Sequence, residues 1–336
     1  MRAVFIISFL VLLGCKNATE KKIDTRQDRF SIEILDDAVL QIISPNAEIK
    51  EIASGYEWTE GPLWIEDGNY LLFSDIPNNK IFKIDADGKT TEFLYPAGYT
   101  GEIPRDGEMG SNGLLLNQDG GLVLLQHGDR RIAKMDATLD SPNPKYITLV
   151  DSYNGKKFHS PNDGVFDSDG NLYFTDPPYG LQDGVNDPAK ELDFQGVYCL
   201  KTSGELVLMD TLTRPNGITF LHDGSKMYVS VSDPEHAVWY RYDVVAPGRV
   251  KNRTLFYNVT ALVGKKGQQG LPDGMKMHSQ GYLFATGPGG VWVFNGNGKP
   301  VARIHTGEAT SNCVFSKSEK TLFMTADDYV LKMDLK

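Results

Sequence analysis

The stretch Pro272-Asp273-Gly274-Met275-Lys276-Met277, with the strand expected after it, shows a pattern that the chain repeats. A small residue or proline precedes a residue with a side-chain oxygen, and glycine usually comes next. We call each oxygen-bearing residue of this pattern a head. The six heads are Glu60, Asn112, Asn162, Asn216, Asp273 and Asn312. Short apolar segments and polar turns follow them, so the pattern predicts a repeated β-unit.

The spacing of the heads selects one architecture. Successive heads lie 52, 50, 54, 57 and 39 positions apart. Asp-Gly and Asn-Gly turns separate short strands within the intervals, which is typical of antiparallel sheet. A unit of about 40 to 57 residues with four short strands matches a propeller blade. We therefore expect an all-β fold, a six-bladed β-propeller of four-stranded antiparallel blades.

The last unit is too short for a whole blade, because only two strands, at residues 321–325 and 329–333, follow its first one. Residues 31–43 contain two apolar runs and could supply the missing strand. We expect this N-terminal strand to close the ring, which removes exposed sheet edges. The propeller is then expected to occupy residues 30–336, after a flexible tether over residues 16–29.

The first residues are typical of a targeting segment. A charged start and an apolar run over residues 3–13, too short to span a bilayer, lead into Leu12-Leu13-Gly14-Cys15. This tetrapeptide resembles a bacterial lipobox. We expect residues 1–15 to be a lipoprotein-type signal peptide cleaved before Cys15, with Cys15 lipidated and the protein anchored in the cell envelope, at the periplasmic or outer-membrane face. The alternative is an ordinary secretory signal in which Cys15 is incidental.

Charge and cysteine content exclude several classes of partner. The formal net charge of -10 argues against nucleic acid, because a polyanion would be repelled and no basic stripe offsets this. The three cysteines make no disulfide framework and no Cys-x-x-Cys pair. A monomer that binds a small neutral or metal-bridged molecule fits this composition better.

Propeller geometry is expected to bring the heads together. If each head begins the innermost strand of its blade, the six side chains surround one end of the central channel. Neighbouring strands are antiparallel, so the ends of the second strands should lie on the same face. These ends are residues 74–75, 126–127, 175–176, 231–233 and 286–287. A loop rich in glycine and proline, residues 95–110, is expected to cover this face as a lid.

The heads carry the oxygen ligands of a hard cation. Glu60 and Asp273 offer carboxylates, and Asn162 and Asn216 offer amide oxygens. This set suits Ca²⁺ above all, with Mg²⁺, Mn²⁺ or Zn²⁺ as alternatives, and it does not suit a structural zinc site. Asn and Asp before glycine are also common turn formers. A glutamate has no such preference, and six heads in register favour a site.

Four motifs, in this order, resemble those of the gluconolactonase/regucalcin (SMP-30/gluconolactonase/LRE-like) family of six-bladed β-propellers. They are Glu60-Gly61-Pro62, Ser160-Pro161-Asn162-Asp163-Gly164, Arg214-Pro215-Asn216-Gly217 and Leu271-Pro272-Asp273-Gly274-Met275. The resemblance runs from about Trp58 to the C-terminus. It implies a divalent cation, usually calcium, held by Glu60, Asn216 and Asp273, with Asn162 as a further ligand or a substrate contact.

Residues 126–131 and 173–180 resemble the bacterial gluconolactonase branch of the family in particular. One position departs from the animal members, which carry an arginine where this chain has Ser160. Recognition of sugar hydroxyls therefore cannot be transferred from those members.

A cation beside two carboxylates can open a lactone. It would act as a Lewis acid on the carbonyl, while a carboxylate activates water. We expect Asp273 to be the general base, with His127 and His159 as alternative proton carriers or residues with only structural hydrogen bonds. Substrate contacts are expected from Asn112, His127, His159 and Asn162. We interpret the other four histidines, among them His278, as solvent-facing.

Two further functions remain open at this point. Propellers with a similar four-residue site hydrolyse phosphotriesters or related esters. A lipid-anchored propeller could also bind a ligand through the same cation without turning it over.

Overall fold

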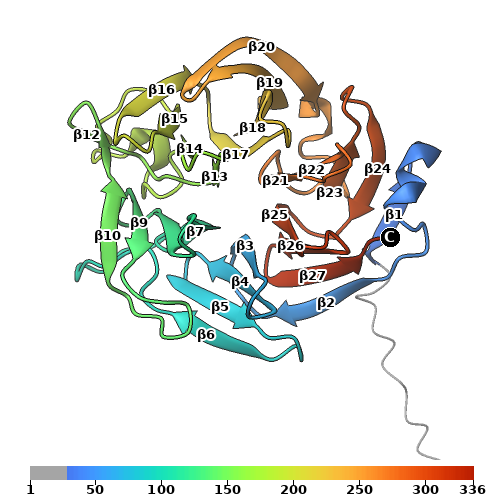
Figure 1. Cartoon of the computed structure of the whole chain (residues 1–336), viewed down its shortest axis with the longest axis horizontal. Helices are drawn as coiled ribbons and strands as arrows, with labels where there is room; N and C mark the ends of the chain where they lie inside the picture. Colours follow the sequence, from blue (N-terminus) through green and yellow to red (C-terminus); the bar gives the residue numbers. More distant parts are fainter. Residues whose placement is uncertain (1–28) are drawn as a thin grey trace, which may run out of the picture.

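Six antiparallel sheets surround one axis in the computed structural model, which describes residues 29–336 (Figure 1). The sheets follow one another around the ring in chain order, as a propeller requires. A separate two-stranded hairpin, β11 (Ser152–Tyr153) and β12 (Lys156–Lys157), leads into the third blade. The expected all-β, six-bladed architecture is confirmed.

Each blade is a short meander whose strands have the following bounds. The first blade contains β3 (Thr59–Ile65), β4 (Tyr70–Asp75), β5 (Lys80–Ile84) and β6 (Thr90–Leu94). The second contains β7 (Ser111–Leu116), β8 (Leu122–Gln126), β9 (Arg131–Met135) and β10 (Tyr146–Val150). The third contains β13 (Gly164–Phe166), β14 (Leu172–Asp176), β15 (Gly196–Leu200) and β16 (Leu206–Thr211).

The remaining three blades complete the ring. The fourth contains β17 (Pro215–Phe220), β18 (Lys226–Asp233), β19 (His236–Ala246) and β20 (Arg249–Asn258). The fifth contains β21 (Met275–Met277), β22 (Leu283–Gly287), β23 (Gly290–Phe294) and β24 (Pro300–His305). The sixth contains β25 (Thr310–Phe315), β26 (Thr321–Ala326) and β27 (Tyr329–Asp334).

An N-terminal strand closes the ring, as expected, but it is not the segment predicted. The strand β2 (Ile49–Ser54) pairs antiparallel with β27 and becomes the outer strand of the sixth blade. The strand β1 (Ser31–Ile34) instead pairs with β24 and gives the fifth blade a fifth strand. Residues 31–43 therefore do not finish the last blade. The N-terminal segment therefore pairs with both the fifth and the sixth blade, which joins the beginning of the propeller to its end.

The second apolar run of residues 31–43 is not a strand. It belongs to a 3₁₀-helix, η2 (Asp37–Gln41), and the turn after it. The fully buried side chains Val39, Ile42 and Ile43 pack into the core between the fifth and sixth blades. Their spacing of three and four positions places them on one face of a helical turn, and this periodicity distinguishes them from a strand. The other short 3₁₀-helices are η3 (Gly184–Asn186) and η4 (Thr260–Leu262).

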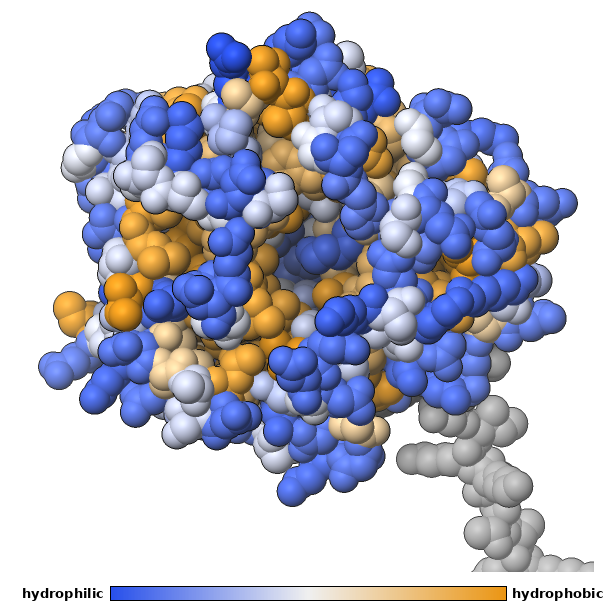
Figure 2. All heavy atoms as spheres, viewed as in Figure 1, coloured by the Kyte–Doolittle hydropathy of each residue, from blue (hydrophilic) through white to orange (hydrophobic). Residues whose placement is uncertain are grey.

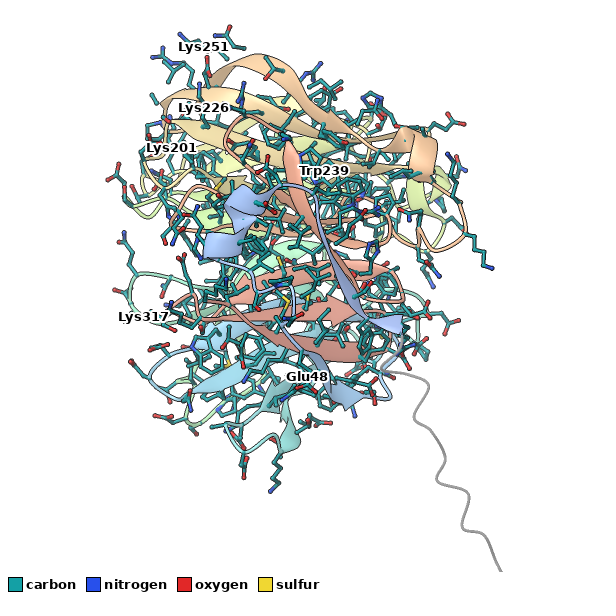
Figure 3. All side chains as sticks on the ribbon, turned by 90° about the vertical axis from the view of Figure 1, so that its right-hand side faces the viewer. Glu48, Lys201, Lys226, Trp239, Lys251 and Lys317 are labelled. Carbon is teal, nitrogen blue, oxygen red and sulfur yellow. The ribbon has the colours of Figure 1, made fainter. Side chains whose placement is uncertain are left out.

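The core consists of apolar layers between adjacent blades. Trp239 is fully buried and lies against Phe294 of the next blade, with ring centroids 5.3 Å apart. In the side view Trp239 lies among the strands, whereas Lys251 projects from the periphery (Figure 3). Within residues 29–336, helices are too short and too polar to cross a membrane. The expected signal peptide, Cys15 and the expected tether up to residue 28 lie outside these residues.

The innermost strands form a continuous ring around the axis. Contacts join β25 to β3, β3 to β7, β7 to β13, β13 to β17, β17 to β21 and β21 to β25. Five heads lie within or directly beside the start of the innermost strand of their blade, and Asn312 lies within β25. The face seen in Figure 2 is hollowed at its centre, and hydrophilic residues lie in its depth.

Candidate active site

One cavity of about 200 Å³ brings five of the six heads together. It is lined by Glu60, Asn112, Asn162, Asn216 and Asp273, as the repeat predicts. The sixth head, Asn312, is not part of the lining. Its amide nitrogen lies 3.4 Å from Oε2 of Glu60, so it supports that carboxylate from within the channel.

Bulges at the starts of the inner strands direct the side chains of the heads toward the axis of the propeller. The pairing register shifts between Glu60 and Leu63, between Ser111 and Leu114, and between Pro215 and Ile218. An extra residue at such a point bends the strand and redirects its side chains. The same local irregularity in three blades explains why head side chains meet in one cavity.

The glycines after the heads permit the inner strands to approach closely. A Cβ on Gly61 would lie 2.0 Å from the carbonyl oxygen of Asn112, and one on Gly217 would lie 2.2 Å from that of Asp273. No side chain fits at such distances. The repeat therefore requires glycine at these positions, because only glycine allows the inner strands to pack this closely around the axis.

Hydroxyl groups from the second strands fix the backbone of the heads in the next blade. The side chain of Ser74 donates to the Asn112 carbonyl at 3.0 Å, Thr175 donates to that of Asn216 at 2.7 Å, and Ser230 donates to that of Asp273 at 2.8 Å. These buried bonds join adjacent blades. They confirm the expectation that the ends of the second strands lie beside the heads.

Four heads each have a side-chain oxygen that receives no hydrogen bond in the described structure. Within the described residues, Oδ1 of Asn112, Asn162, Asn216 and Asp273 is buried and has no hydrogen-bond partner. Buried acceptors left unpaired are costly, and four in one cavity need an explanation. A bound cation would supply it, because each of these atoms is a hard oxygen ligand of the kind that calcium and magnesium prefer.

The proposed ligands do not form a cluster of acidic and imidazole side chains. No cluster of three or more His, Cys, Asp or Glu able to hold a metal ion is found within residues 29–336. The lining heads provide only two carboxylates, and amides provide the remaining oxygens. A site of this composition suits a hard divalent cation and not a thiolate- or imidazole-bound ion.

The electrostatics of the cavity favour a cation. Burial raises the pKa of Glu60 to about 8, and the nearby charge of Asp163 acts in the same direction. Burial also raises the pKa of Asp273 well above its ordinary value, and the charge of Glu60 adds to this effect. Among the described residues that line the cavity there is no lysine or arginine. A divalent cation would relieve the repulsion between the two carboxylates.

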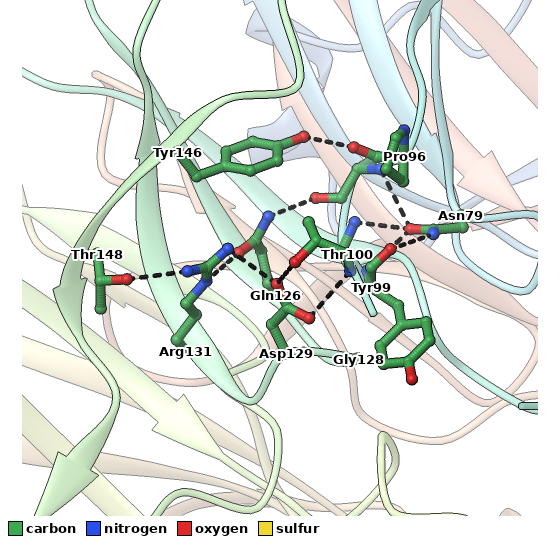
Figure 4. Close-up of polar contacts among 12 residues, drawn as sticks. Asn79, Pro96, Tyr99, Thr100, Gln126, Gly128, Asp129, Arg131, Tyr146 and Thr148 are labelled. Carbon is green, nitrogen blue, oxygen red and sulfur yellow. Dashed lines mark hydrogen bonds and ion pairs between the residues drawn. The ribbon is translucent and has the colours of Figure 1, made fainter. Parts of the chain in front are cut away.

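The loop of residues 95–110, which we call the lid, is fastened at its beginning. Oδ1 of Asn79 accepts from the backbone N–H groups of Ala97, Gly98 and Tyr99, at 3.1, 2.7 and 3.1 Å (Figure 4). The amide nitrogen of Gln126 donates to the Ala97 carbonyl at 2.8 Å. The beginning of the lid is therefore held by both the first and the second blade.

The segment 126–131 also holds the next part of the lid. The carboxylate of Asp129 accepts from the backbone N–H of Thr100 at 3.0 Å and from its hydroxyl at 2.7 Å (Figure 4). Arg131 in turn donates to Asp129 at 2.8 Å and to Gln126 at 2.7 Å. Residues 126–131, which resemble the bacterial gluconolactonase branch, therefore have a structural role, because they position the lid.

The lid contributes a carboxylate that the repeat did not predict. Glu108 lines the cavity beside the heads. Its Oε2 lies 3.0 Å from Nδ1 of His127, whose side chain is fully buried. Glu108 lies outside the head pattern, so only its place in the expected lid, three positions before Ser111, could have indicated it.

The two candidate histidines differ in position. His127 stands behind the cavity, with Nε2 3.4 Å from the amide nitrogen of Asn162. His159 is not in the cavity lining. Its Nε2 lies 3.0 Å from the Leu192 carbonyl and its Nδ1 lies 3.5 Å from Asp176, contacts that hold the chain before Asn162. The interpretation of His278 as solvent-facing is wrong, because it is only 4% exposed.

Comparisons with known proteins agree with this geometry. The sequence model of the SMP-30/Gluconolactonase/LRE-like region matches residues 58–328. A gluconolactonase of Zymomonas mobilis is 39% identical over 305 residues, which are 89% of this chain and 84% of that protein. The diisopropyl-fluorophosphatase of Loligo vulgaris is 27% identical over 282 residues, which are 79% of this chain and 84% of that protein.

Solved structures give the same result. The structure of a gluconolactonase from Xanthomonas campestris has a TM-score of 0.77 and 27% identity, and the match covers 91% of this chain and 95% of that one. The family match covers most of the described propeller and includes all five heads that line the cavity. This chain therefore belongs to the SMP-30/gluconolactonase/LRE-like family.

Proposed function

We propose that this protein is a hydrolase that opens a sugar lactone such as gluconolactone with the help of a divalent cation, calcium above all. Its assignment as a lactonase is supported by the gluconolactonase of Zymomonas mobilis, 39% identical over 89% of this chain. The observation that supports the cation is the set of buried, unpartnered oxygens of Asn162, Asn216 and Asp273 within the described cavity. Glu60 completes the ligand set that we propose.

A cation held there by Glu60, Asn162, Asn216 and Asp273 would supply Lewis acidity toward the lactone carbonyl and would stabilise the negative charge that develops on its oxygen. Asp273 accepts a proton from the water that attacks the carbonyl carbon. As the bond between that carbon and the ring oxygen breaks, the protonated carboxyl returns the proton to the departing oxygen. The product is the open hydroxy acid. Burial raises the pKa of Asp273, and the positive charge of a bound cation would act in the opposite direction.

The cavity fits a small neutral substrate. Its volume of about 200 Å³ lies below the range of about 300–1,000 Å³ that accommodates drug-sized ligands. Glu108 and Asn112 offer hydrogen bonds to hydroxyl groups, while Trp58 and Tyr179 offer apolar walls. Three carboxylates line the cavity, so a phosphorylated or carboxylated lactone should bind much more weakly than a neutral one.

A second activity has one observation in its favour. The similarity to the diisopropyl-fluorophosphatase of Loligo vulgaris extends over 79% of this chain. A neutral phosphotriester would present its P=O oxygen to the same cation. A panel of gluconolactone, a simple δ-lactone and a phosphotriester, each assayed with calcium and with chelator, separates these activities. Chelator-sensitive opening of gluconolactone is expected, and absence of turnover on every substrate would indicate a binding propeller.

We also propose that Cys15 carries a lipid anchor and that the protein is attached to the cell envelope. The support is the run Leu12-Leu13-Gly14-Cys15 after a short apolar segment. Cys15→Ser should move the full-length protein from the membrane fraction to the soluble fraction. Unchanged fractionation would contradict the anchor.

A further inference from the structure

Three residues form a chain of contacts from the lid to the candidate cation site. Oε2 of Glu108 lies 3.0 Å from Nδ1 of His127. Nε2 of the same ring lies 3.4 Å from the amide nitrogen of Asn162. The amide oxygen of Asn162 has no hydrogen-bond partner among residues 29–336, and the residue lines the cavity.

One neutral tautomer of His127 fits both contacts. Nδ1 lies 3.0 Å from the carboxylate of Glu108 without the alignment of a hydrogen bond, and this negative charge favours a hydrogen on Nδ1. In a neutral ring Nε2 is then an acceptor, and it can receive a hydrogen from the amide nitrogen of Asn162. With its nitrogen engaged in this way, the amide of Asn162 turns its oxygen toward the cavity.

The ring of His127 has little freedom to adopt another arrangement. Its side chain is fully buried. A Cβ on Gly180 would lie 2.8 Å from the Cβ of His127, which shows how closely the neighbouring loop packs against it. Arg105 of the lid donates to the carbonyls of Gly128 and Gly180, at 3.1 and 2.5 Å. The lid is therefore attached to the two loops that surround this ring.

We propose that Glu108 and His127 are positioning residues that orient the amide of Asn162, and that through them the lid is coupled to the cation site. This inference rests on the proposed cation site. The charge of Glu108 selects the tautomer of His127, and the tautomer selects the orientation of the amide. If Glu108 is lost, Nε2 can carry the hydrogen instead, and the amide of Asn162 can turn its nitrogen toward the cation.

The first test is the affinity for calcium, measured by calorimetry on chelator-treated full-length protein. Loss of a residue that orients a metal ligand typically weakens metal affinity by about 10–100-fold. We expect Glu108→Ala and His127→Ala each to fall in this range, and the double variant to be no weaker than His127→Ala. Glu102→Ala removes an exposed carboxylate from the same lid and should leave the affinity unchanged. Melting curves without calcium verify that each variant is folded.

The second test separates orientation from general support of the fold. In an Asn162→Asp background both side-chain positions are oxygens, so no amide needs to be oriented. Glu108→Ala should then cost little or no calcium affinity, in contrast to its effect in the wild-type background. An equal loss in both backgrounds would mean that Glu108 only supports the structure, and would overturn the proposal.

The lid offers a readout that does not depend on turnover. Hydrogen exchange of residues 96–110 should slow when calcium is added to the wild-type protein, and this protection should be lost in His127→Ala. If the wild-type protein binds calcium but neither the affinity nor the exchange responds to Glu108→Ala and His127→Ala, the coupling is wrong and the proposed function stands. If the wild-type protein binds no calcium, both are wrong.

Discussion

The amide nitrogen of Asn216 donates to the hydroxyl of Ser232 at 3.1 Å. That hydroxyl donates onward to the carbonyl of Pro272, the residue before Asp273. The bond fixes which atom of the Asn216 amide faces the cavity, and it leaves the oxygen without a partner in the described structure. Ser232 thus serves two heads of adjacent blades, and it does so independently of the lid.

Ser232→Ala should weaken calcium binding by about 10-fold, because the amide of Asn216 loses the group that orients it. The measurement is a calcium titration followed by calorimetry. Ser225→Ala is the matched control, since Ser225 is exposed at the hairpin turn of the same blade and its hydroxyl donates to Asp223 within that turn. Equal affinities of the two variants would refute this role for Ser232.

Gly217→Ala should lower the melting temperature even without calcium. The new Cβ would meet the Asp273 carbonyl oxygen at 2.2 Å, so the inner strands of two blades must move apart. Overpacking of this kind costs about 1–3 kcal/mol. Gly296→Ala provides the comparison, because nothing lies within 4 Å of a Cβ there. If thermal scans give both variants the same stability, close packing of the inner strands does not limit the ring.

The N-terminal strands make different contributions to stability. A chain that begins at residue 45 loses η2 and β1, an additional strand at the edge of the fifth blade, whereas a chain that begins at residue 56 also loses β2. We expect the second truncation to lower the melting temperature by more than about 10 °C relative to the first. Closure of the ring contributes several kcal/mol to the free energy of unfolding, and each kcal/mol shifts the melting temperature by about 2–4 °C. Similar melting temperatures would show that β2 does not secure the ring.

His278 should make the fold sensitive to acid. Its Nδ1 accepts from the backbone N–H of Gln280 at 3.2 Å, and burial lowers the pKa of His278 below its ordinary value of 6.5. The stability contributed by the neutral ring is present above the unfolded pKa of 6.5 and is lost as pH falls through the lower folded pKa. His278→Gln should therefore flatten the fall of the melting temperature between about pH 7 and pH 5. An unchanged slope would exclude His278 as its source.

The repeat made the fold and most of the site predictable. A regular spacing between glycine-flanked heads implies blades, and blades imply that the heads meet at the axis. Glu60, Asn162, Asn216 and Asp273 come together in one cavity for this reason. The lining role of Asn112 follows from the same periodicity.

Features of the structure that lie outside the repeat could not be predicted from the sequence in the same way. Glu108 reaches the cavity from the lid, whose path depends on contacts with Asn79 and Asp129 and not on any period. The closing strand β2 has an exposed or partly exposed residue at most positions, so its sequence lacks the apolar run that was expected. His278 is covered by packing against Phe315, a residue 37 positions away, which a local pattern does not reveal.

We expect lactone opening to depend on a cation held by the heads and on Asp273 as the base. The most direct measurement is the rate of gluconolactone hydrolysis against free calcium, for chelator-treated wild-type protein and for Asp273→Asn. We predict that the wild-type rate falls to background without calcium and recovers on saturation, while Asp273→Asn stays at least about 10²-fold lower in saturating calcium. A wild-type rate indifferent to chelator, or full activity of Asp273→Asn, would contradict the account.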